Sequence, residues 1–75
     1  MGDARVAVNV VDAFVKARRG DEIIYHNGLL MRDRQTDQHV HVRAEYAYTK
    51  HLLGEAMLFQ RRISDTKCAY LMVKL

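Results

Sequence analysis

Apolar residues near the start of the chain recur with a helical spacing. Four positions form this pattern: Ala7, Val10 or Val11, Phe14 and Ala17. Asn9 is a suitable N-cap, Asp12 complements the helix dipole, and Gly20 can adopt the left-handed conformation that ends a helix. The pattern predicts a helix over about residues 9–19 and leaves open whether residues 1–8 continue it, lie extended or are flexible.

A short β-type run and a second, shorter helix are expected next. The run Asp21–His26 is rich in β-branched and aromatic residues and stops at Asn27-Gly28, which is typical of a strand closed by a turn. Leu29–Arg34 has helical spacing over one or two turns. The polar residues Gln35–Gln38 are expected to form a loop.

A second long helix is predicted over about residues 39–53, where Gly54 ends it. Its apolar positions make one inward stripe: Val40, Ala44, Ala47 or Tyr48, and Leu52. The residues on the opposite side are expected to face solvent: Arg43, Glu45, Tyr46, Thr49 and Lys50.

The last third of the chain changes to a β-type pattern. Met57–Ile63 and Cys68–Val73 are two such runs, and the polar residues Ser64–Lys67 between them are typical of an antiparallel hairpin. A chain of 75 residues is long enough for one domain. We therefore predict a single α+β domain over residues 1–75, in the order helix, strand, short helix, helix, strand, strand, with a small antiparallel sheet.

This order of elements resembles the winged-helix variant of the helix-turn-helix, in which a strand separates the first two helices and a two-stranded wing follows the third. The run Gly20–Leu30, followed by Arg32-Asp33-Arg34, is also similar to a group of small phage-encoded proteins, as is the basic segment Leu58–Arg62. The resemblance covers about residues 9–74. It implies a third helix that faces the major groove and a wing that contacts the DNA backbone or the minor groove.

The net charge of +3 lies entirely in the second half of the chain. Residues 1–37 contain six lysines and arginines and six acidic residues, whereas residues 38–75 contain six basic residues and three acidic ones. A surplus of this kind can steer an anionic partner, although many solvated surfaces carry as much charge.

Two groups of residues are candidates for contact with DNA. The first lies on one face of the predicted third helix: Arg43, Tyr46, Thr49 and Lys50. The second lies on the predicted wing: Arg61, Arg62 and Lys67. Because adjacent strand residues point to opposite faces, at most one of the two arginines shares a face with Lys67. The alternative interpretations are a plain solvated helix face and charges that protect an edge hairpin from aggregation.

The predicted hairpin carries apolar residues on both faces, and three helices shield only one side of so small a sheet. Four side chains are therefore candidates for an interface: Met57, Phe59, Tyr70 and Met72. At this chain length apolar burial barely outweighs chain entropy, so a homodimer or another protein partner is expected.

Several classes of protein are disfavoured by what the sequence lacks. No apolar run approaches the roughly 20 residues of a membrane span, and residues 1–5 do not begin a signal-peptide pattern, so we expect a cytoplasmic protein. The single cysteine, Cys68, excludes an internal disulfide framework. Four histidines lack the spacing of a metal site: His26, His39, His41 and His51. With no phosphate-binding loop and no catalytic constellation, we expect no enzyme activity, cofactor or metal.

Two functions follow as hypotheses. The first is a small winged-helix transcriptional regulator of phage type that binds double-stranded DNA. The second is a phage-type inhibitor or adaptor that uses the same scaffold to bind a host protein complex, such as RNA polymerase or a defence complex. The fold alone does not choose between these functions.

Overall fold

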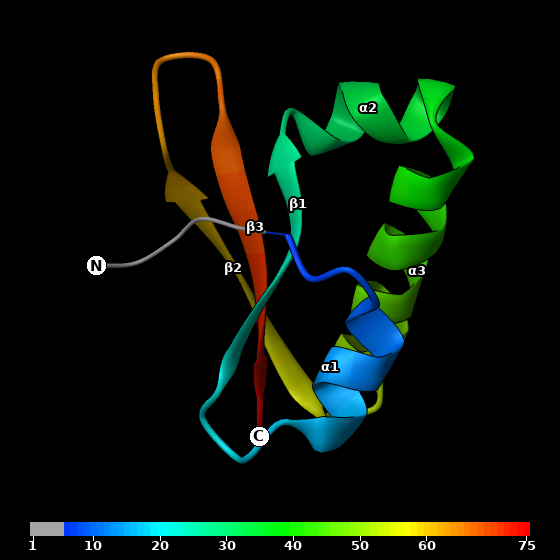
Figure 1. Ribbon diagram of the computed structural model, residues 1–75, viewed down its shortest axis with the longest axis vertical. Helices are drawn as coiled ribbons and strands as arrows, with labels where there is room; N and C mark the ends of the chain where they lie inside the picture. Colours follow the sequence, from blue (N-terminus) through cyan, green and yellow to red (C-terminus); the bar gives the residue numbers. More distant parts are fainter. Residues whose placement is uncertain (1–5) are drawn as a thin grey trace.

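The computed structural model describes residues 6–75, which form three helices and three strands in the predicted order (Figure 1). The elements are α1 (Val10–Lys16), β1 (Glu22–Gly28), α2 (Leu30–Thr36), α3 (Gln38–Leu52), β2 (Ala56–Arg62) and β3 (Cys68–Lys74). The prediction for the N-terminal segment falls partly outside the described residues, because residues 1–5 are not among them. Residues 6–8 are not helical, and the N–H of Ala7 donates to the carbonyl of Ile24 at 3.0 Å.

The three strands form one antiparallel sheet in the order β1-β3-β2, so β3 is the central strand. Ile24, Leu71 and Phe59 are aligned across the three strands. Below, the hairpin of β2, β3 and the turn over residues 63–67 is called the wing. The predicted α+β class and element order are confirmed, and the sheet order is consistent with winged-helix-like topology.

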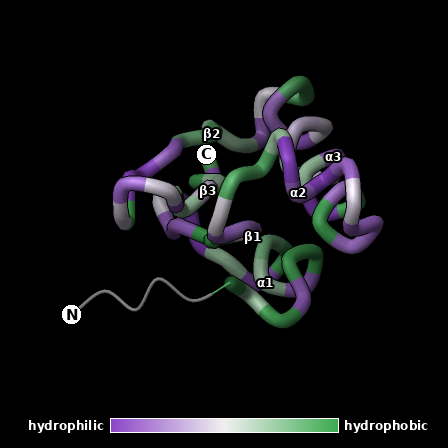
Figure 2. Tube along the Cα trace, turned by 90° about the horizontal axis from the view of Figure 1, so that it is seen from above, coloured by the Kyte–Doolittle hydropathy of each residue, from purple (hydrophilic) through white to green (hydrophobic). Residues whose placement is uncertain are grey.

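The helices lie on one side of the sheet, and the core fills the space between them (Figure 2). Each helix and strand except α2 contributes at least one buried apolar residue to this core: Val10, Phe14, Ile23, Tyr25, Ala44, Ala47, Ala56 and Met72. Three of these residues are alanines on α3 and β2, and their small side chains allow the helix to approach the sheet closely.

The first helix begins where the sequence predicts and ends earlier. Asn9 is the N-cap, and its Oδ1 accepts the N–H of Asp12 at 3.0 Å. The helix was expected to reach residue 19, but it ends at Lys16 because Ala17 adopts an extended conformation with ψ 152°. The side chain of Asp21 then accepts the N–H of Arg18 at 2.9 Å, which stabilises the turn into β1.

The region between β1 and α3 is more regular than the sequence suggests. The predicted turn at Asn27-Gly28 is wrong, because both residues continue β1 and pair with β3. The predicted loop over residues 35–38 is also wrong: α2 extends to Thr36, and Asp37 alone separates it from α3. Asp37 caps α3 by accepting the N–H of His39 at 2.9 Å. One capping residue therefore replaces the expected loop.

The inward stripe of α3 is partly as predicted. Val40, Ala44 and Ala47 are buried, whereas Tyr48 and Leu52 are exposed. His51, one helical turn after Ala47, is the next residue on that side; it is exposed, and its Nδ1 lies 3.1 Å from the carbonyl oxygen of Ala56. Leu52 is therefore about 100° away from the buried side of the helix.

Candidate nucleic-acid and protein interfaces

The basic and aromatic residues predicted to face DNA from α3 instead lie on the flank of the helix nearest α1 and β1. Arg43 Nε donates to the carbonyl oxygen of Tyr25 at 3.0 Å. Tyr25 has no register partner on β3, since the β1–β3 ladder shifts between Ile24 and His26. Arg43 therefore supplies a donor to the backbone of a β-bulge, which would otherwise lack a partner from the ladder.

Tyr46 and Lys50 lie on the same flank of α3. The rings of Tyr46 and Phe14 meet edge to face, with centroids 6.1 Å apart and an interplanar angle of 83°. Lys50 Nζ lies 5.6 and 5.7 Å from the Tyr46 and Phe14 centroids, and it donates to Glu55 Oε1 at 3.0 Å. This hydrogen bond raises the pKa of Lys50 above its usual value. Of the four predicted residues on α3, Thr49 is the one whose side chain is exposed without such a contact.

The solvent side of α3 carries exposed apolar side chains among polar ones such as Glu45 and Thr49. Val42, Tyr48 and Leu52 are 56%, 51% and 67% exposed, and below they are called the outer stripe of α3. Glu45 lies on the same side and is paired with Arg34 of α2. The four-residue spacing of Tyr48 and Leu52 is visible in the sequence, but the prediction placed Leu52, and either Ala47 or Tyr48, on the inward side of the helix.

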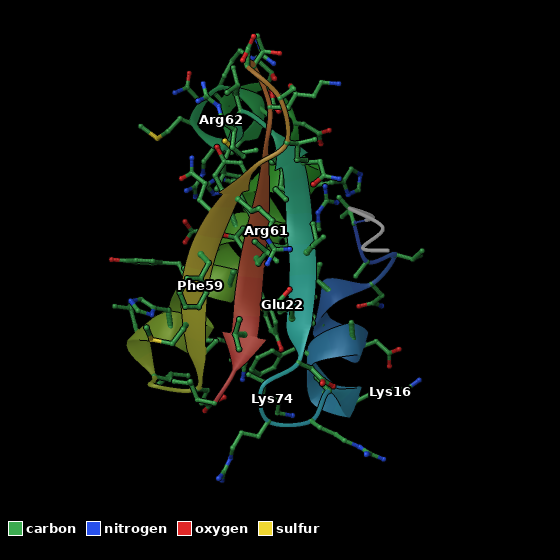
Figure 3. All side chains as sticks on the ribbon, turned by 90° about the vertical axis from the view of Figure 1, so that its left-hand side faces the viewer. Lys16, Glu22, Phe59, Arg61, Arg62 and Lys74 are labelled. Atoms are coloured by element: carbon green, nitrogen blue, oxygen red, sulfur yellow. The ribbon has the colours of Figure 1, made fainter. Side chains whose placement is uncertain are left out.

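The two adjacent arginines of the wing lie on opposite faces of the sheet. Arg61 Nη2 is 3.2 Å from Glu22 Oε1, and the two side chains reach toward one another across β3 (Figure 3). Arg62 lies on the other face together with Lys67. They line one shallow hollow, below called the wing hollow, with four further polar residues: Gln60, Ser64, Asp65 and Thr66.

Both cations of the wing hollow are accessible to solvent. The backbone carbonyl of Ser64 accepts a hydrogen bond from Arg62 Nε at 3.3 Å, and Lys67 is exposed. Leu29, at the junction of β1 and α2, closes one side of the hollow, so α2 lies at the same end of the molecule as the wing (Figure 1). Arg32 of α2 remains 71% exposed although its Nε lies 3.1 Å from Asp33 Oδ1.

The four residues predicted for an interface separate onto the two faces of the sheet. Met57 and Phe59 lie on the face away from the helices and are 43% and 51% exposed. Met72 is fully buried under the helices. The hydroxyl of Tyr70 accepts the N–H of Leu30 at 3.2 Å, so it anchors α2 to the sheet. Tyr70 and Met72 therefore do not belong to an exposed interface, because their strand positions point toward the core.

A polar cluster that the sequence reasoning missed connects β1 to α2. His26 is buried, and its Nε2 lies 2.7 Å from Asp33 Oδ2. The same carboxylate oxygen accepts the N–H of Leu29, the N-cap residue of α2, at 3.2 Å. The hydrogen bond with His26 holds the pKa of Asp33 below its usual value, and those from Arg32 and Leu29 act in the same direction. The cluster serves the fold, because all of its partners belong to this junction.

The remaining histidines do not gather with other ligands. His41 Nδ1 contacts the guanidinium of Arg34, and His51 contacts the backbone of Ala56. Within residues 6–75, no group of three or more histidine, cysteine, aspartate or glutamate side chains is arranged to hold a metal ion. Over the same residues, no helix is long and apolar enough to cross a membrane.

The helices and the antiparallel sheet together define a small α+β domain of winged-helix-like topology. No family model, curated protein or solved structure matches the chain. Arguments about function therefore depend on the surfaces described above.

Proposed function

We propose that this domain is a small DNA-binding regulator that contacts the phosphate backbone of duplex DNA with its wing. The observation that supports this proposal is the wing hollow, where the exposed cations Arg62 and Lys67 outnumber the one carboxylate in its lining, Asp65, and share the surface with hydroxyl and amide groups. Arginine, lysine, serine, threonine and glutamine are the side chains that bind phosphate oxygens in protein–DNA complexes. Such backbone contacts supply most of the affinity of weakly specific binding.

The proposal gives α3 a smaller role than the winged-helix resemblance implies. Arg43 and Lys50 are occupied by Tyr25 and Glu55, so neither is free to fork onto a base without breaking a contact within the chain. Arg32 on α2 is the further exposed cation at the wing end. Two or three phosphate contacts and little base reading predict modest affinity with weak sequence preference.

The experiment is a titration of labelled duplex DNA followed by fluorescence anisotropy, repeated between about 50 and 200 mM salt. The logarithm of affinity should fall with the logarithm of salt concentration with a slope of about −2 to −3, because each neutralised phosphate contributes about −0.9. The double variant Arg62→Ala, Lys67→Ala should lose binding. The matched control is Arg18→Ala, Arg19→Ala, which removes two exposed cations at the other end of the molecule.

Three outcomes would contradict the proposal. They are no duplex binding by the unaltered chain at low salt, equal losses in the wing variant and its control, and a wing variant that binds as tightly as the unaltered chain. Circular dichroism spectra of both variants should match that of the unaltered chain, since the altered side chains are exposed.

A second candidate function is protein binding through the outer stripe of α3, as expected of an inhibitor or adaptor of a host complex. The observation that favours it is that Tyr48 and Leu52, one helical turn apart, expose neighbouring apolar side chains on α3, and Val42 is exposed nearer the start of the helix. Contiguous exposed apolar side chains are typical of protein interfaces. In a winged-helix protein that reads DNA, this side of the third helix would face the major groove.

The second function has a distinct signature in an affinity capture from a nuclease-treated lysate of the organism that encodes the chain. A stoichiometric partner should be retained by the variant Arg62→Ala, Lys67→Ala and lost by Tyr48→Ala, Leu52→Ser. The control Thr49→Ala alters a neighbouring exposed residue of α3 and should retain the partner. A partner that survives the outer-stripe variant would contradict this function.

A further inference from the structure

β2 is an edge strand, and its hydrogen bonds to β3 show which of its backbone groups point away from the sheet (Figure 3). The N–H of Leu75 donates to the carbonyl of Glu55 at 3.0 Å. At the other end of the ladder, the N–H of Ile63 donates to the carbonyl of Lys67 at 3.0 Å. Odd-numbered residues of β2 therefore direct their backbone groups to β3, because the direction alternates along an antiparallel strand. The even-numbered residues direct theirs outward: Ala56, Leu58, Gln60 and Arg62.

The two edges of the sheet differ in how they are covered. On β1, the N–H of Ala7 and the side chain of Arg43 donate to backbone carbonyls of the strand. On β2, His51 Nδ1 lies 3.1 Å from the carbonyl oxygen of Ala56. Within residues 6–75, no hydrogen bond reaches the outward backbone groups of the next three such residues. These residues are called the free edge below: Leu58, Gln60 and Arg62.

The side chains beside the free edge do not protect it from another strand. Met57, Phe59 and Ile63 are 43%, 51% and 46% exposed, so apolar surface follows the edge. The two arginines at this end of β2 are engaged elsewhere: Arg61 reaches across β3 to Glu22, and Arg62 Nε donates to the carbonyl of Ser64. An exposed edge with apolar side chains is a template for pairing with a further strand.

We propose that the free edge pairs with the free edge of a second copy of this chain, in antiparallel orientation. The twofold axis is perpendicular to the sheet and passes between the two copies at Gln60. Gln60 then lies opposite its own counterpart, and Leu58 lies opposite Arg62 of the other copy. Each of these pairs exchanges two backbone hydrogen bonds, because all three residues direct their N–H and C=O groups outward. The two sheets become one continuous sheet.

The side chains of the edge are complementary to themselves about this axis. Between the hydrogen-bonded pairs, Met57 lies opposite Ile63 of the other copy, so two exposed apolar side chains cover each other. Phe59 lies opposite Arg61, whose guanidinium is held by Glu22 and whose aliphatic stem is left beside the ring. No two like charges face one another. An isologous contact requires this self-complementarity, and it selects a second copy as the partner.

The neighbouring positions of the axis fit less well. An axis at Phe59 pairs Arg62 with Ala56, whose carbonyl already has a partner. An axis at Arg61 places this arginine directly opposite its counterpart, which is unfavourable. Gln60 is the midpoint of the free edge, so an axis there uses all of its backbone groups.

The first test is sedimentation velocity between about 5 and 500 µM protein, since one pair of strands makes a small interface of micromolar affinity. The unaltered chain should shift from monomer to dimer over this range. Gln60→Pro removes an outward N–H and no bond to β3, so it should weaken the dimer at least tenfold. Gln60→Ala is the matched control: it keeps the N–H and should dimerise as the unaltered chain does. A thermal melt of each variant establishes that it is folded.

The second test measures the register by disulfide cross-linking in a Cys68→Ser background. Residues opposite each other between hydrogen-bonded pairs have Cα atoms about 4.5 Å apart, a distance that a disulfide spans. An equimolar mixture of Met57→Cys and Ile63→Cys chains should therefore cross-link at least tenfold faster than either variant by itself. Phe59→Cys, which lies opposite residue 61, should cross-link to itself no faster than Met57→Cys does.

Four outcomes would overturn the proposal. They are a monomer at every concentration, a folded Gln60→Pro chain that dimerises as tightly as Gln60→Ala, a mixture that cross-links no faster than its components, and rapid cross-linking of Phe59→Cys to itself. The cross-linking result decides the matter if Gln60→Pro does not fold. Both experiments are made without DNA, so their failure is distinct from a failure of the proposed DNA binding.

Discussion

His26 Nε2 and Asp33 Oδ2 lie 2.7 Å apart, and this contact joins the end of β1 to α2. Asp33 also accepts the N–H of Leu29, so one carboxylate satisfies both a buried ring nitrogen and the first free donor of the helix. Gly28 lies between these groups in the chain. His26, Gly28 and Asp33 together set the position of α2 and of Leu29 at its start. Leu29 lines the wing hollow, so this junction also shapes that surface.

Gly28→Ala should unfold the chain at markedly lower denaturant concentration. Gly28 has φ +137°, and a Cβ there would lie 2.5 Å from Asp33 Oδ2 and 3.1 Å from His26 Nε2. We expect a loss of about 3 kcal/mol in the free energy of unfolding, measured by urea denaturation. Gly54→Ala is the control: Gly54 also has a positive φ, but a Cβ would meet nothing within 4 Å, so its cost should be about 1 kcal/mol. Equal costs would refute the proposed crowding.

The stability of the chain should fall in acid in a way that depends on Asp33. Its pKa in the folded state is below the usual 3.8, chiefly because of the hydrogen bond with His26. Ionised Asp33 therefore stabilises the fold above the unfolded pKa, and this contribution is lost as pH falls through the lower folded pKa. Asp33→Asn should be less stable at neutral pH and should lose less on acidification below about pH 4. Thermal melts at a series of pH values measure this difference.

The matched control for the acid experiment is Asp65→Asn, which removes an exposed carboxylate from the turn of the wing. It should retain the acid-dependent loss of the unaltered chain. An Asp33→Asn profile parallel to that of the unaltered chain would show that this contact does not contribute to acid sensitivity.

Arg43→Ala should lower stability without weakening DNA binding. The variant leaves the Tyr25 carbonyl at the bulge of β1 without its side-chain donor, at a cost of about 1 to 2 kcal/mol. The affinity of the folded variant for duplex DNA should match that of the unaltered chain in the anisotropy titration. The variant Arg62→Ala, Lys67→Ala should show the reverse, with binding lost and stability changed by less than about 0.5 kcal/mol. If Arg43→Ala were as stable as the unaltered chain but bound duplex DNA more weakly, α3 would have to be part of the DNA-binding surface.

Lys74→Ala should loosen α1. Lys74 Nζ donates to the carbonyl oxygen of Phe14 at 3.0 Å, and it lies 5.1 Å from the centroid of the Phe14 ring. These contacts tie the C-terminal end of a seven-residue helix to the central strand. We expect a loss of about 1 kcal/mol, with faster amide hydrogen exchange in α1 than in α3. Lys67→Ala, which changes an exposed lysine of the wing, should leave both measurements unaltered.

The order of the elements could be predicted because each has a local signal. Asn9 marks the start of α1, and the change from a helical to an alternating pattern marks the wing. Local signals were weaker at the junction of β1 and α2, where an Asn-Gly pair suggests a turn. Pairing of Gly28 with Cys68 on β3 continues the strand there, and this partner lies 40 positions away in the chain.

The candidate surfaces were harder to predict because long side chains do not follow polarity alone. Lysine and arginine can pack their aliphatic stems against apolar groups, as Lys50 does beside Phe14 and Tyr46. A helical wheel that places every cation in solvent therefore misplaces Arg43 and Lys50. The same wheel places the apolar Leu52 in the interior, whereas it is exposed. On the wing, strict alternation makes the prediction simpler, and the separation of Arg61 from Arg62 was expected from the sequence.

The position of β3 between β1 and β2 has a consequence for synthesis of the chain. β1 and β2 pair with β3 and not with each other, so the sheet lacks its central member until residues 68–74 have been made. A ribosome-bound chain that ends before Cys68 has no β3 for β1 and β2 to pair with, and it leaves exposed the side chains that Met72 and Leu71 later cover. The domain should therefore fold only when its last seven-residue strand emerges, in a single late step rather than element by element.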